Sequence, residues 1–363
     1  MGTLIHAMLE AEMKQNGRLQ KAGLREKEAS RRANNLESYA NHRLATLSPL
    51  FKAFKEEATQ TVLFEGTTEL TNSTDEIDET IELCKGVFKN WLFCRGVEDL
   101  DRYDVISTEF KFEMPLIHNG FQALGWIVSG LVDCLLWDRK NEIFILREYK
   151  TTSGDPVDYQ SRVSLDPQVR IYAEAVRQSG LTRGKPIKSV EYAVLKRKLP
   201  SLPKMINCKS CKGKKSTKSG VCEKCNEDGQ VLSTSALDTT FDALASHLSN
   251  FPDSPEKEEL LEKNKNKGWE KFICVHEHYL QDADVAETIG EVFRASEEIV
   301  GAVEEYHSQK DLSIFPKNVS HCTGSYFGCE YRELCGSRIP VENVEFRNSN
   351  WVECSDHPEL DER

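Results

Sequence analysis

Three kinds of feature are absent from this 363-residue sequence, and each absence excludes a class of protein. No apolar run is long enough to cross a bilayer, because the longest, from Ala123 to Trp137, is interrupted by Asp133. No charged segment followed by an apolar one opens the chain, so we expect no signal peptide. No G-x4-G-K-[ST] phosphate-binding loop occurs, so any nucleotide-driven motor would be a separate chain. We therefore expect a soluble cytoplasmic protein that has no membrane partner.

Positive charge is also in the minority. The chain has 47 Lys and Arg residues against 59 Asp and Glu residues, a formal net charge of −12 at pH 7. A protein that simply coats nucleic acid is usually basic overall, which disfavours that class. An acidic total still permits a local basic groove, and it suits a site that collects divalent cations.

The basic residues gather in one stretch that contains no Asp or Glu. Its members are Lys196, Arg197, Lys198, Lys204, Lys209, Lys212, Lys214, Lys215 and Lys218. Such a block either contacts the phosphate backbone of a nucleic acid or forms a solvated loop, and the sequence leaves both interpretations open.

Apolar and polar residues alternate, or form short buried runs bounded by turn residues, in five predicted strands. They span residues 105–116, 121–138, 143–152, 189–198 and 271–280. Helical periodicity is found in residues 2–14, 18–57, 81–93, 165–180, 235–248 and 284–305. Residues 70–79 are predicted to be a loop or a helix entry, with Ser73 and Glu76 at capping-box spacing. Strands that lead into a helix and a further strand indicate an α/β core with a mixed sheet.

Two neighbouring predicted strands carry polar groups in an unusual pattern. Asp133 follows an apolar run in one strand, and Glu148 and Lys150 lie two residues apart in the next. Because side chains alternate along a strand, Glu148 and Lys150 point to the same face, and Asp133 in an adjacent hairpin is within reach.

The two carboxylates would repel each other unless a cation lay between them, and Mg²⁺ prefers such oxygen ligands. The carbonyl of Tyr149 could complete the coordination. Lys150 would orient a metal-bound water and offset the negative charge that develops on the phosphate in the transition state. The alternative is an ordinary exposed strand face with Asp133 at a strand end.

The residues from Gly130 to Thr152 and the helix after them resemble the RecB-like branch of the PD-(D/E)XK nucleases, whose members include phage and bacterial recombination nucleases. The opening GTLIHAMLE resembles the family's first helix, which implies that His6 is a metal ligand. EYKTTS resembles the strand of the second carboxylate. Gln168 and Tyr172 match the family's Q-x-x-x-Y helix, which approaches DNA and the catalytic lysine. Each of these residues taken alone is also compatible with a structural or surface role.

The resemblance implies a restriction-endonuclease-like α/β core, with a central mixed sheet flanked by helices. To this core the cysteine spacing described below adds a small zinc-ribbon insertion. The resemblance also implies an Mg²⁺- or Mn²⁺-dependent DNA nuclease, an exonuclease of recombination, repair or phage genome processing, in a bacterial or phage-infected cell. The alternatives are an endonuclease or nickase of the same fold, or a non-catalytic DNA-binding or recruitment module. A separate helicase or recombinase is an expected partner.

We expect the nuclease core in residues 1–204, the insertion in 205–232, a helical completion of the domain in 233–340 and a polar tail in 341–363. The insertion contains the pattern C-x2-C-x10-C-x2-C, formed by Cys208, Cys211, Cys222 and Cys225. Two C-x2-C pairs across a short loop have the spacing of a zinc ribbon, in which four thiolates hold a structural Zn²⁺.

Cys322, Cys329 and Cys335 lie near the C-terminus with the spacing C-x6-C-x5-C. They resemble the cysteines that many RecB-like nucleases use for an iron–sulfur cluster. The family's fourth cysteine precedes the first helix, and no cysteine occupies that position here. Either a ligand lies outside this sequence, or a residue such as His321 or Cys354 substitutes, or no cluster forms. Cys84, Cys94, Cys134 and Cys274 are expected to be small buried apolar residues.

Overall fold

A computed structural model describes residues 1–64, 70–163, 166–217, 220–222, 225 and 228–309. The chain divides into two compact units, Met1–Arg294 and Ala295–Arg363. The first unit holds the sheet and every predicted catalytic residue. Of the second unit, the structure describes the end of one helix, to Gln309.

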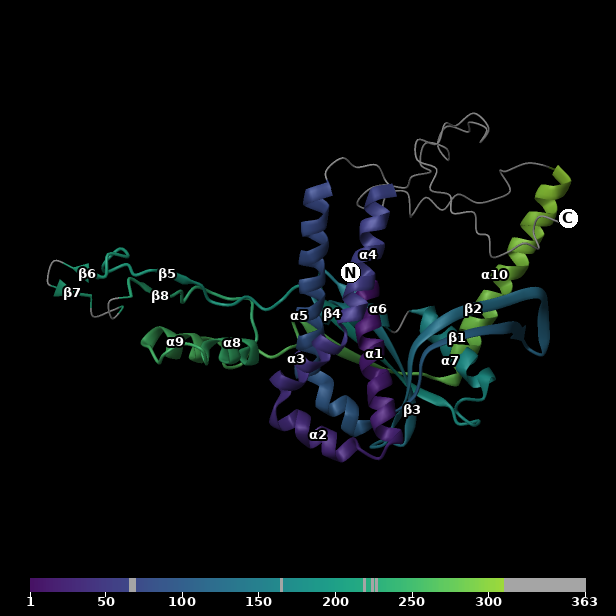
Figure 1. Cartoon of the computed structure of the whole chain (residues 1–363). Helices are drawn as coiled ribbons and strands as arrows, with labels where there is room; N and C mark the ends of the chain where they lie inside the picture. Colours follow the sequence, from purple (N-terminus) through teal and green to yellow (C-terminus); the bar gives the residue numbers. More distant parts are fainter. Residues whose placement is uncertain (65–69, 164–165, 218–219, 223–224, 226–227, 310–363) are drawn as a thin grey trace. The chain divides into compact units, whose positions relative to one another are not determined.

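A mixed sheet of five strands forms the centre of the first unit, in the order β1-β2-β3-β4-β9. The strands are β1 (Tyr103–His118), β2 (Phe121–Asp138), β3 (Ile143–Thr152), β4 (Ile187–Lys196) and β9 (Ile273–Tyr279). All neighbours are antiparallel except β3 and β4, which are parallel (Figure 1). The five predicted strands and the mixed sheet are confirmed, and the bounds of β2 and β3 match the prediction residue for residue.

Five helices precede the sheet. They are α1 (Gly2–Lys21), α2 (Arg25–Asn34), α3 (Leu36–Thr46), α4 (Ser48–Phe64) and α5 (Leu70–Arg102). Leu4, Ile5 and Met8 of α1 pack with Trp91 of α5 and Tyr149 of β3 in one buried cluster. This cluster covers the sheet face toward which Tyr149 points.

Two of the helix predictions for this region were wrong in detail. The charged stretch 18–57 is not one helix, because Gly23 has a φ of +70° just past α1 and the Asn35 side chain starts α3 by accepting from the Ser38 N–H. Residues 70–79 belong to α5, so Ser73 and Glu76 do not mark a helix start. Ile77 and Ile81 of α5 share a cluster with Phe51 and Phe54 of α4, and this packing outweighs the local capping signal.

The opposite face of the sheet is covered by α7 (Pro167–Ser179) and by the first part of α10 (Asp282–Gln309). The helix predicted in residues 165–180, with Pro167 near its first turn and Gly180 just past its end, is confirmed as α7, since Pro167 is its first residue and Gly180 follows its end with a φ of +74°. Its cap at Asp166 was not predicted. The short helices η1 (Pro156–Tyr159) and α6 (Gln160–Val163) connect β3 to α7.

A buried charge network ties β3 to its neighbours. The guanidinium of Arg147 donates to the Glu191 carboxylate of β4 at 2.6 and 2.9 Å and to the Asp99 carboxylate of α5 at 2.8 Å. The Tyr103 hydroxyl donates to the second oxygen of Glu191 at 2.5 Å. Burial alone would raise the pKa of Glu191, but Arg147 and Tyr103 hold that pKa below its ordinary value. Glu191 is therefore a carboxylate that the guanidinium neutralises.

A segment of 76 residues, 197–272, is inserted between β4 and β9. Two short strand pairs, β5 (Met205–Asn207) with β8 (Gln230–Leu232) and β6 (Ser216–Thr217) with β7 (Gly220–Val221), form the predicted insertion. The two helices α8 (Phe241–Leu248) and α9 (Pro255–Asn264) follow. We call residues 199–232 the cysteine arm.

The two helices after the arm differ from prediction. Helix α8 begins at Phe241 and not at Ser235, because the Thr240 side chain caps it by accepting from the Ala243 N–H. Helix α9 was missed, although Ser254 and Pro255 form a standard helix start. Among the described residues, no helix is long and apolar enough to cross a membrane.

Replacement of Arg147 by methionine is expected to lower the free energy of unfolding by about 3–5 kcal/mol, because it leaves buried carboxylates without their guanidinium. Chemical denaturation of the metal-free protein measures this change. Lys55→Ala is the control, since the exposed pair between Lys55 and Asp78 contributes about 1 kcal/mol or less. Equal stabilities for the two variants would contradict the central role of the network.

Candidate active site

The predicted catalytic residues lie where β2 and β3 separate. The two strands pair from Asp138 with Ile143 to Cys134 with Arg147, and the pairing ends there. Strand β3 continues beside β4 as far as the pair Thr152 and Lys196. The edge of β3 that faces β2 is therefore free of backbone pairing from Glu148 onward.

Asp133 is the first residue of β2 beyond this ladder. Its Oδ2 accepts a hydrogen bond from the backbone N–H of Tyr149 at 2.8 Å, so a side-chain carboxylate takes the place of a strand carbonyl. The Nδ1 atom of His6, on α1, lies 3.9 Å from the same oxygen. Burial lowers the pKa of His6 although Asp133 opposes the shift, so the imidazole has a free lone pair at neutral pH. The structure brings His6, Asp133 and Tyr149 together as predicted.

Glu148 and Lys150 point to the same face of β3, as the strand period predicts. The Lys150 Nζ donates to Glu148 Oε1 and to Gln168 Oε1, both at 2.8 Å. One helical turn further along α7, the Tyr172 hydroxyl accepts from Gln168 Nε2 at 2.6 Å. The matched Gln168 and Tyr172 thus form a chain of hydrogen bonds that ends on the ammonium of Lys150.

The electrostatics of the site suit a cation. Burial, and then repulsion by Asp133, raise the pKa of Glu148 to about 7. Burial also raises the pKa of Asp133, although the Tyr149 N–H opposes this shift. Burial would lower the pKa of Lys150, but its contact with Glu148 raises that pKa overall, so the ammonium stays charged.

The donor set fits an oxygen-preferring divalent ion. Asp133, Glu148 and the Tyr149 carbonyl offer oxygens, and His6 offers a neutral nitrogen. Among the described residues, the four arm cysteines are the one group of three or more His, Cys, Asp or Glu residues whose ligand atoms all lie within 4.8 Å of one another, so His6, Asp133 and Glu148 do not meet that limit. Because Lys150 donates to Glu148 Oε1, an ion at the carboxylates would share Glu148 with that hydrogen bond.

Gly130 and Phe112 lie near the site, and the sequence predicted no role for either of them. A Cβ on Gly130 would lie 2.7 Å from Phe112 and 3.3 Å from Tyr172, so only glycine leaves room for these rings. The Phe112 and Tyr172 rings meet edge to face with centroids 5.7 Å apart, which fixes Tyr172 under Gln168. The spacing of Gly130 to Asp133 was visible in the sequence, but the partner ring on β1 was not.

Glu109 is a third carboxylate beside the site. It falls opposite Asp133, between the pairs Thr108 with Cys134 and Phe110 with Val132, and has a φ of +48°. Burial, Glu10 and Asp133 raise its pKa. No short sequence pattern marked this residue, because its place depends on the register of β1 and β2.

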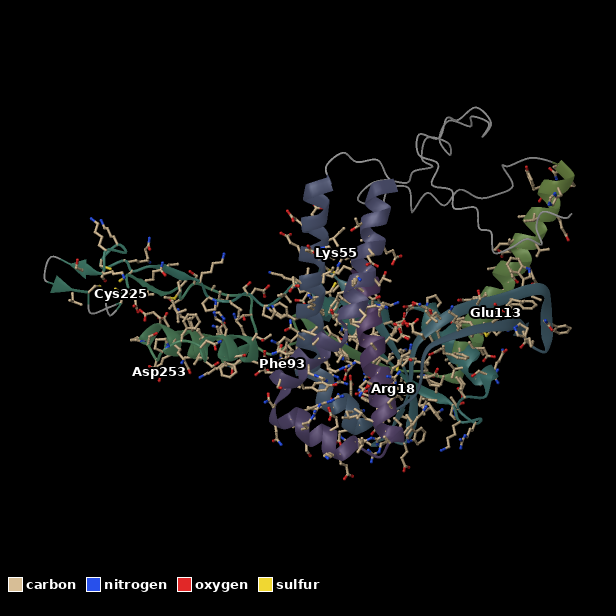
Figure 2. All side chains as sticks on the ribbon, in the orientation of Figure 1. Arg18, Lys55, Phe93, Glu113, Cys225 and Asp253 are labelled. Carbon is tan, nitrogen blue, oxygen red and sulfur yellow. The ribbon has the colours of Figure 1, made fainter. Side chains whose placement is uncertain are left out.

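The four arm cysteines are brought together as predicted. Cys225, one of them, is labelled in the arm in Figure 2. The Sγ atoms of Cys208 and Cys222 lie 3.9 Å apart, and those of Cys211 and Cys225 lie 3.7 Å apart. Tetrahedral zinc with bonds of about 2.3 Å requires sulfur separations of roughly 3.8 Å. Backbone N–H groups of Cys211 and Ser210 lower the pKa of Cys208 to about 7, which favours the thiolate. The arrangement fits a closed structural zinc site.

The predicted basic residues divide between two places. Lys196, Arg197 and Lys198 lie at the end of β4, and Lys212, Lys214 and Lys215 are exposed in the cysteine arm. Lys218 lies outside the described residues. The proposed iron–sulfur ligands Cys322, Cys329 and Cys335, with His321 and Cys354, also lie outside them. Of the remaining cysteines, Cys84 and Cys134 are buried as expected, while Cys94 and Cys274 are only half-buried.

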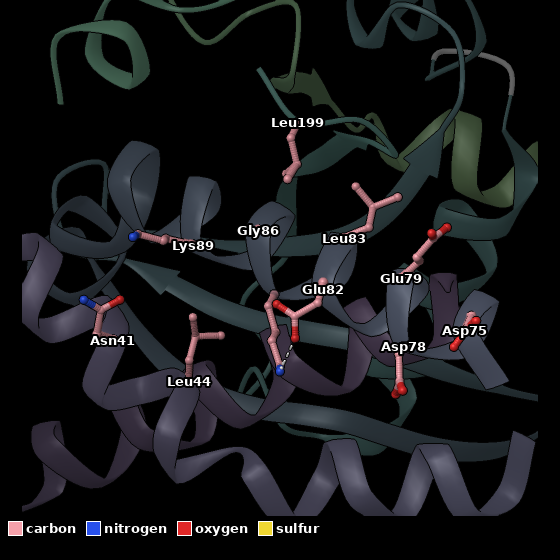
Figure 3. Close-up of a pocket in the computed structure, with 11 residues that line it drawn as sticks. Asn41, Leu44, Asp75, Asp78, Glu79, Glu82, Leu83, Gly86, Lys89 and Leu199 are labelled. Atoms are coloured by element: carbon pink, nitrogen blue, oxygen red, sulfur yellow. Dashed lines mark hydrogen bonds and ion pairs between the residues drawn. The ribbon is translucent and has the colours of Figure 1, made fainter. Parts of the chain in front are cut away.

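A pocket of about 890 Å³ lies away from these residues, between α3, α5 and the start of the cysteine arm (Figure 3). Its lining includes four acidic side chains of α5, Asp75, Asp78, Glu79 and Glu82, together with Leu199. None of the predicted catalytic residues lines this pocket, whose lining also includes Lys85 and Lys89. The candidate active site therefore remains the gap between β2 and β3.

One family model matches residues 1–336, and it is described as the PD-(D/E)XK nuclease superfamily. No curated protein matches the chain. The match includes the sheet, the helix with His6, the helix with Gln168 and the cysteine arm.

The stability of the metal-free protein is expected to depend on pH through Glu148. Its carboxyl keeps a proton up to about pH 7 in the folded state, against an ordinary value of 4.5 for the unfolded chain. Between these values the folded state binds more protons, so stability falls as pH rises. Glu148→Gln should match wild type near pH 4.5 and exceed it at pH 8 by up to about 3 kcal/mol.

Denaturation at several pH values, with the metal removed, measures this difference. Glu113→Gln, which changes an exposed glutamate of β1, serves as the control and should show no such trend. If the difference in free energy of unfolding between Glu148→Gln and wild type does not change with pH, Glu148 is ionised over the whole pH range measured.

The purified protein is expected to contain one zinc ion per chain in the arm. Cys211→Ala should remove it, because three thiolates no longer close the tetrahedral site. Elemental analysis measures the metal, and amide hydrogen exchange over residues 205–232 should become faster while the sheet is unchanged. Cys94→Ala, outside the arm, should keep the zinc, and full zinc occupancy in Cys211→Ala would rule out the four-cysteine site.

Proposed function

The chain belongs to the PD-(D/E)XK nuclease superfamily, and from its site we propose that it is a metal-dependent DNA nuclease of the RecB-like type. The observation that carries the proposal is the position of the Lys150 ammonium. It lies 2.8 Å from both Glu148 and Gln168, one residue from the Tyr149 N–H that binds Asp133. Two buried carboxylates and one fixed ammonium on adjacent strands form a site for phosphodiester hydrolysis.

Asp133, Glu148 and the Tyr149 carbonyl would hold Mg²⁺ or Mn²⁺, with His6 as a further ligand. Such an ion, when bound, would stabilise negative charge on the scissile phosphate and lower the pKa of a bound water. The Tyr149 N–H keeps Asp133 turned toward the gap between the strands. Neutral His6 on α1 approaches the same carboxylate from the other side.

Lys150 has the role of electrostatic stabilisation. Its ammonium is held on the strand edge that β2 leaves free, where it would orient the attacking water and offset the charge that develops on phosphorus oxygens. Gln168 fixes the ammonium by accepting one of its protons, and Tyr172 fixes Gln168. The side chains that meet the substrate are therefore positioned before it binds.

Exonuclease action in recombination, repair or phage genome processing is the form of this activity that we propose, on the RecB-like motifs around His6, Gln168 and Tyr172. An endonuclease or nickase would use the same residues. A separate helicase or recombinase is the expected partner, in the cytoplasm of a bacterial or phage-infected cell. A non-catalytic DNA-binding module would not require Asp133, Glu148 and Lys150 to be retained together.

Digestion of end-labelled linear DNA and closed-circular DNA with Mg²⁺ or Mn²⁺ tests the proposal. Wild type should degrade linear DNA, and Lys150→Ala should be slower by roughly 10²–10³-fold, because it loses a preorganised charge in the transition state. A chelator should abolish the reaction. Lys140→Ala, an exposed lysine in the turn between β2 and β3, should keep full activity.

Survival of the circles would identify an exonuclease, and the label released first would give its polarity. Cleavage of the circles would identify an endonuclease or nickase. If wild type and Lys150→Ala are equally inactive with either metal while both bind DNA, the proposed function is wrong and the binding module takes its place.

A further inference from the structure

We propose that the cysteine arm is a clamp for double-stranded DNA, which holds the duplex within about one helical turn of the scissile phosphate. The inference rests on the proposed nuclease function and specifies its substrate. It follows from where the arm leaves the sheet, how both its ends are fixed, and which side chains it exposes.

The arm leaves the sheet beside the active site. Strands β3 and β4 are parallel, so their carboxyl ends lie at the same edge, with Thr152 of β3 paired to Lys196 of β4. The Arg197 N–H donates to the Thr152 carbonyl at 2.8 Å, two residues beyond Lys150. Arg197 is exposed there, next to the strand end that would face the phosphate.

The base of the arm is fixed to the body of the first unit. Leu199 lies against Gly86 of α5, where a Cβ would come within 2.6 Å of it. The Asp238 carbonyl accepts from the Ser201 N–H at 2.7 Å, and its carboxylate binds Lys198 at 2.8 Å. At the return of the arm, Leu232 is buried in a cluster with Leu244, Leu248 and Leu260. At the far end the ligand atoms of the four cysteines lie within 4.8 Å of one another, and a zinc ion bound there would fix the backbone that carries the lysines.

The arm exposes several lysines. Lys209, Lys212, Lys214 and Lys215 are exposed, and none of them joins an ion pair with another residue that the structure describes. Several of the side chains drawn near Cys225 in Figure 2 end in nitrogen. By contrast, Lys55, Lys85 and Lys89 each bind a carboxylate. In a chain with a net charge of −12, such a group of exposed lysines is a local site for phosphate groups.

The composition of the arm favours a duplex over a single strand. Residues 205–232 contain no Phe, Tyr or Trp. Proteins that bind single strands stack bases on such rings, whereas lysines alone contact the backbone without reading bases. The arm therefore recognises the regular phosphate pattern of a duplex, independently of sequence.

The length of the arm limits where it touches DNA. From Lys198 to Lys209 the chain can span at most about 40 Å, at roughly 3.3–3.6 Å per residue. This equals about 12 base pairs at 3.4 Å each. A duplex with a phosphate at Lys150 would thus meet Lys209, the first lysine beside the four cysteines, within about one turn.

Binding of Lys150→Ala protein to DNA tests the clamp without cleavage. The arm variant adds Lys212→Gln, Lys214→Gln and Lys215→Gln, and the matched control adds Lys27→Gln, Lys140→Gln and Lys188→Gln, which are exposed and change charge equally. For a 24-base-pair duplex, the arm variant should lose at least about tenfold in affinity at 0.15 M salt. Its slope of log K against log[salt] should fall by about 2–3, close to 0.9 per lost phosphate contact. The control should do neither.

Zinc content of one ion per chain verifies that the arm variant is folded. The clamp is overturned if the arm variant and the control bind the 24-base-pair duplex alike. It is also overturned if the arm variant loses the same affinity for single-stranded DNA or if duplex RNA binds more tightly.

Cleavage by proteins with intact Lys150 separates this inference from the proposed function. If the enzyme cuts DNA and the arm variant cuts long and short duplexes as the control does, the clamp fails and the nuclease stands. If the arm-dependent binding is found but no protein cuts DNA, the nuclease fails and the clamp stands.

Discussion

One buried guanidinium determines how the catalytic strand is held. Arg147 compensates Asp99 of α5 and Glu191 of β4, and it lies directly before Glu148 on β3. A slip of β3 by one residue would turn Arg147 to the opposite face and leave both carboxylates buried without a partner, which is far more costly than a lost surface pair. Because side chains alternate between the two faces along β3, Arg147 points toward α5, whereas Glu148 and Lys150 point toward α7. The register of the whole site therefore depends on an ion pair that takes no part in the chemistry.

The separation of β2 from β3 gives the site its opening, and Asp133 makes that separation possible. A strand edge with unpaired N–H groups is unfavourable, and the Asp133 carboxylate satisfies the first of them, at Tyr149. The residue therefore has a structural task beside its proposed catalytic one. The cost is repulsion between two carboxylates, which together with burial raises the pKa of Glu148 to about 7. A cation bound between the two carboxylates would relieve this repulsion.

The sequence predicted those parts of the molecule that have local causes. The bounds of β2 and β3, the caps of α7 and the approach of four cysteines follow from alternation, capping residues and metal-ligand spacing. The order of the motifs also predicted the superfamily that the family model identifies. The start of α5, the Arg147 network, and the contact of Gly130 with Phe112 were not predicted. Each depends on partners distant in the chain, which no local pattern specifies, while the branch and the residue roles remain predictions.

The hydrogen bond from the Lys196 N–H to the Phe272 carbonyl, 2.8 Å long, joins the two ends of the 76-residue insertion. Because β4 and β9 are neighbours in the sheet, the segment leaves the sheet and returns to it at almost one point. The segment is therefore a closed loop that is attached to two adjacent strands. Loop closure costs little more as a loop lengthens, since each doubling adds about 0.6 kcal/mol. A change in the length of this segment therefore leaves the pairing of β4 with β9 possible. In such an architecture the inserted part can grow or shrink while the sheet that carries Asp133, Glu148 and Lys150 keeps its strand order.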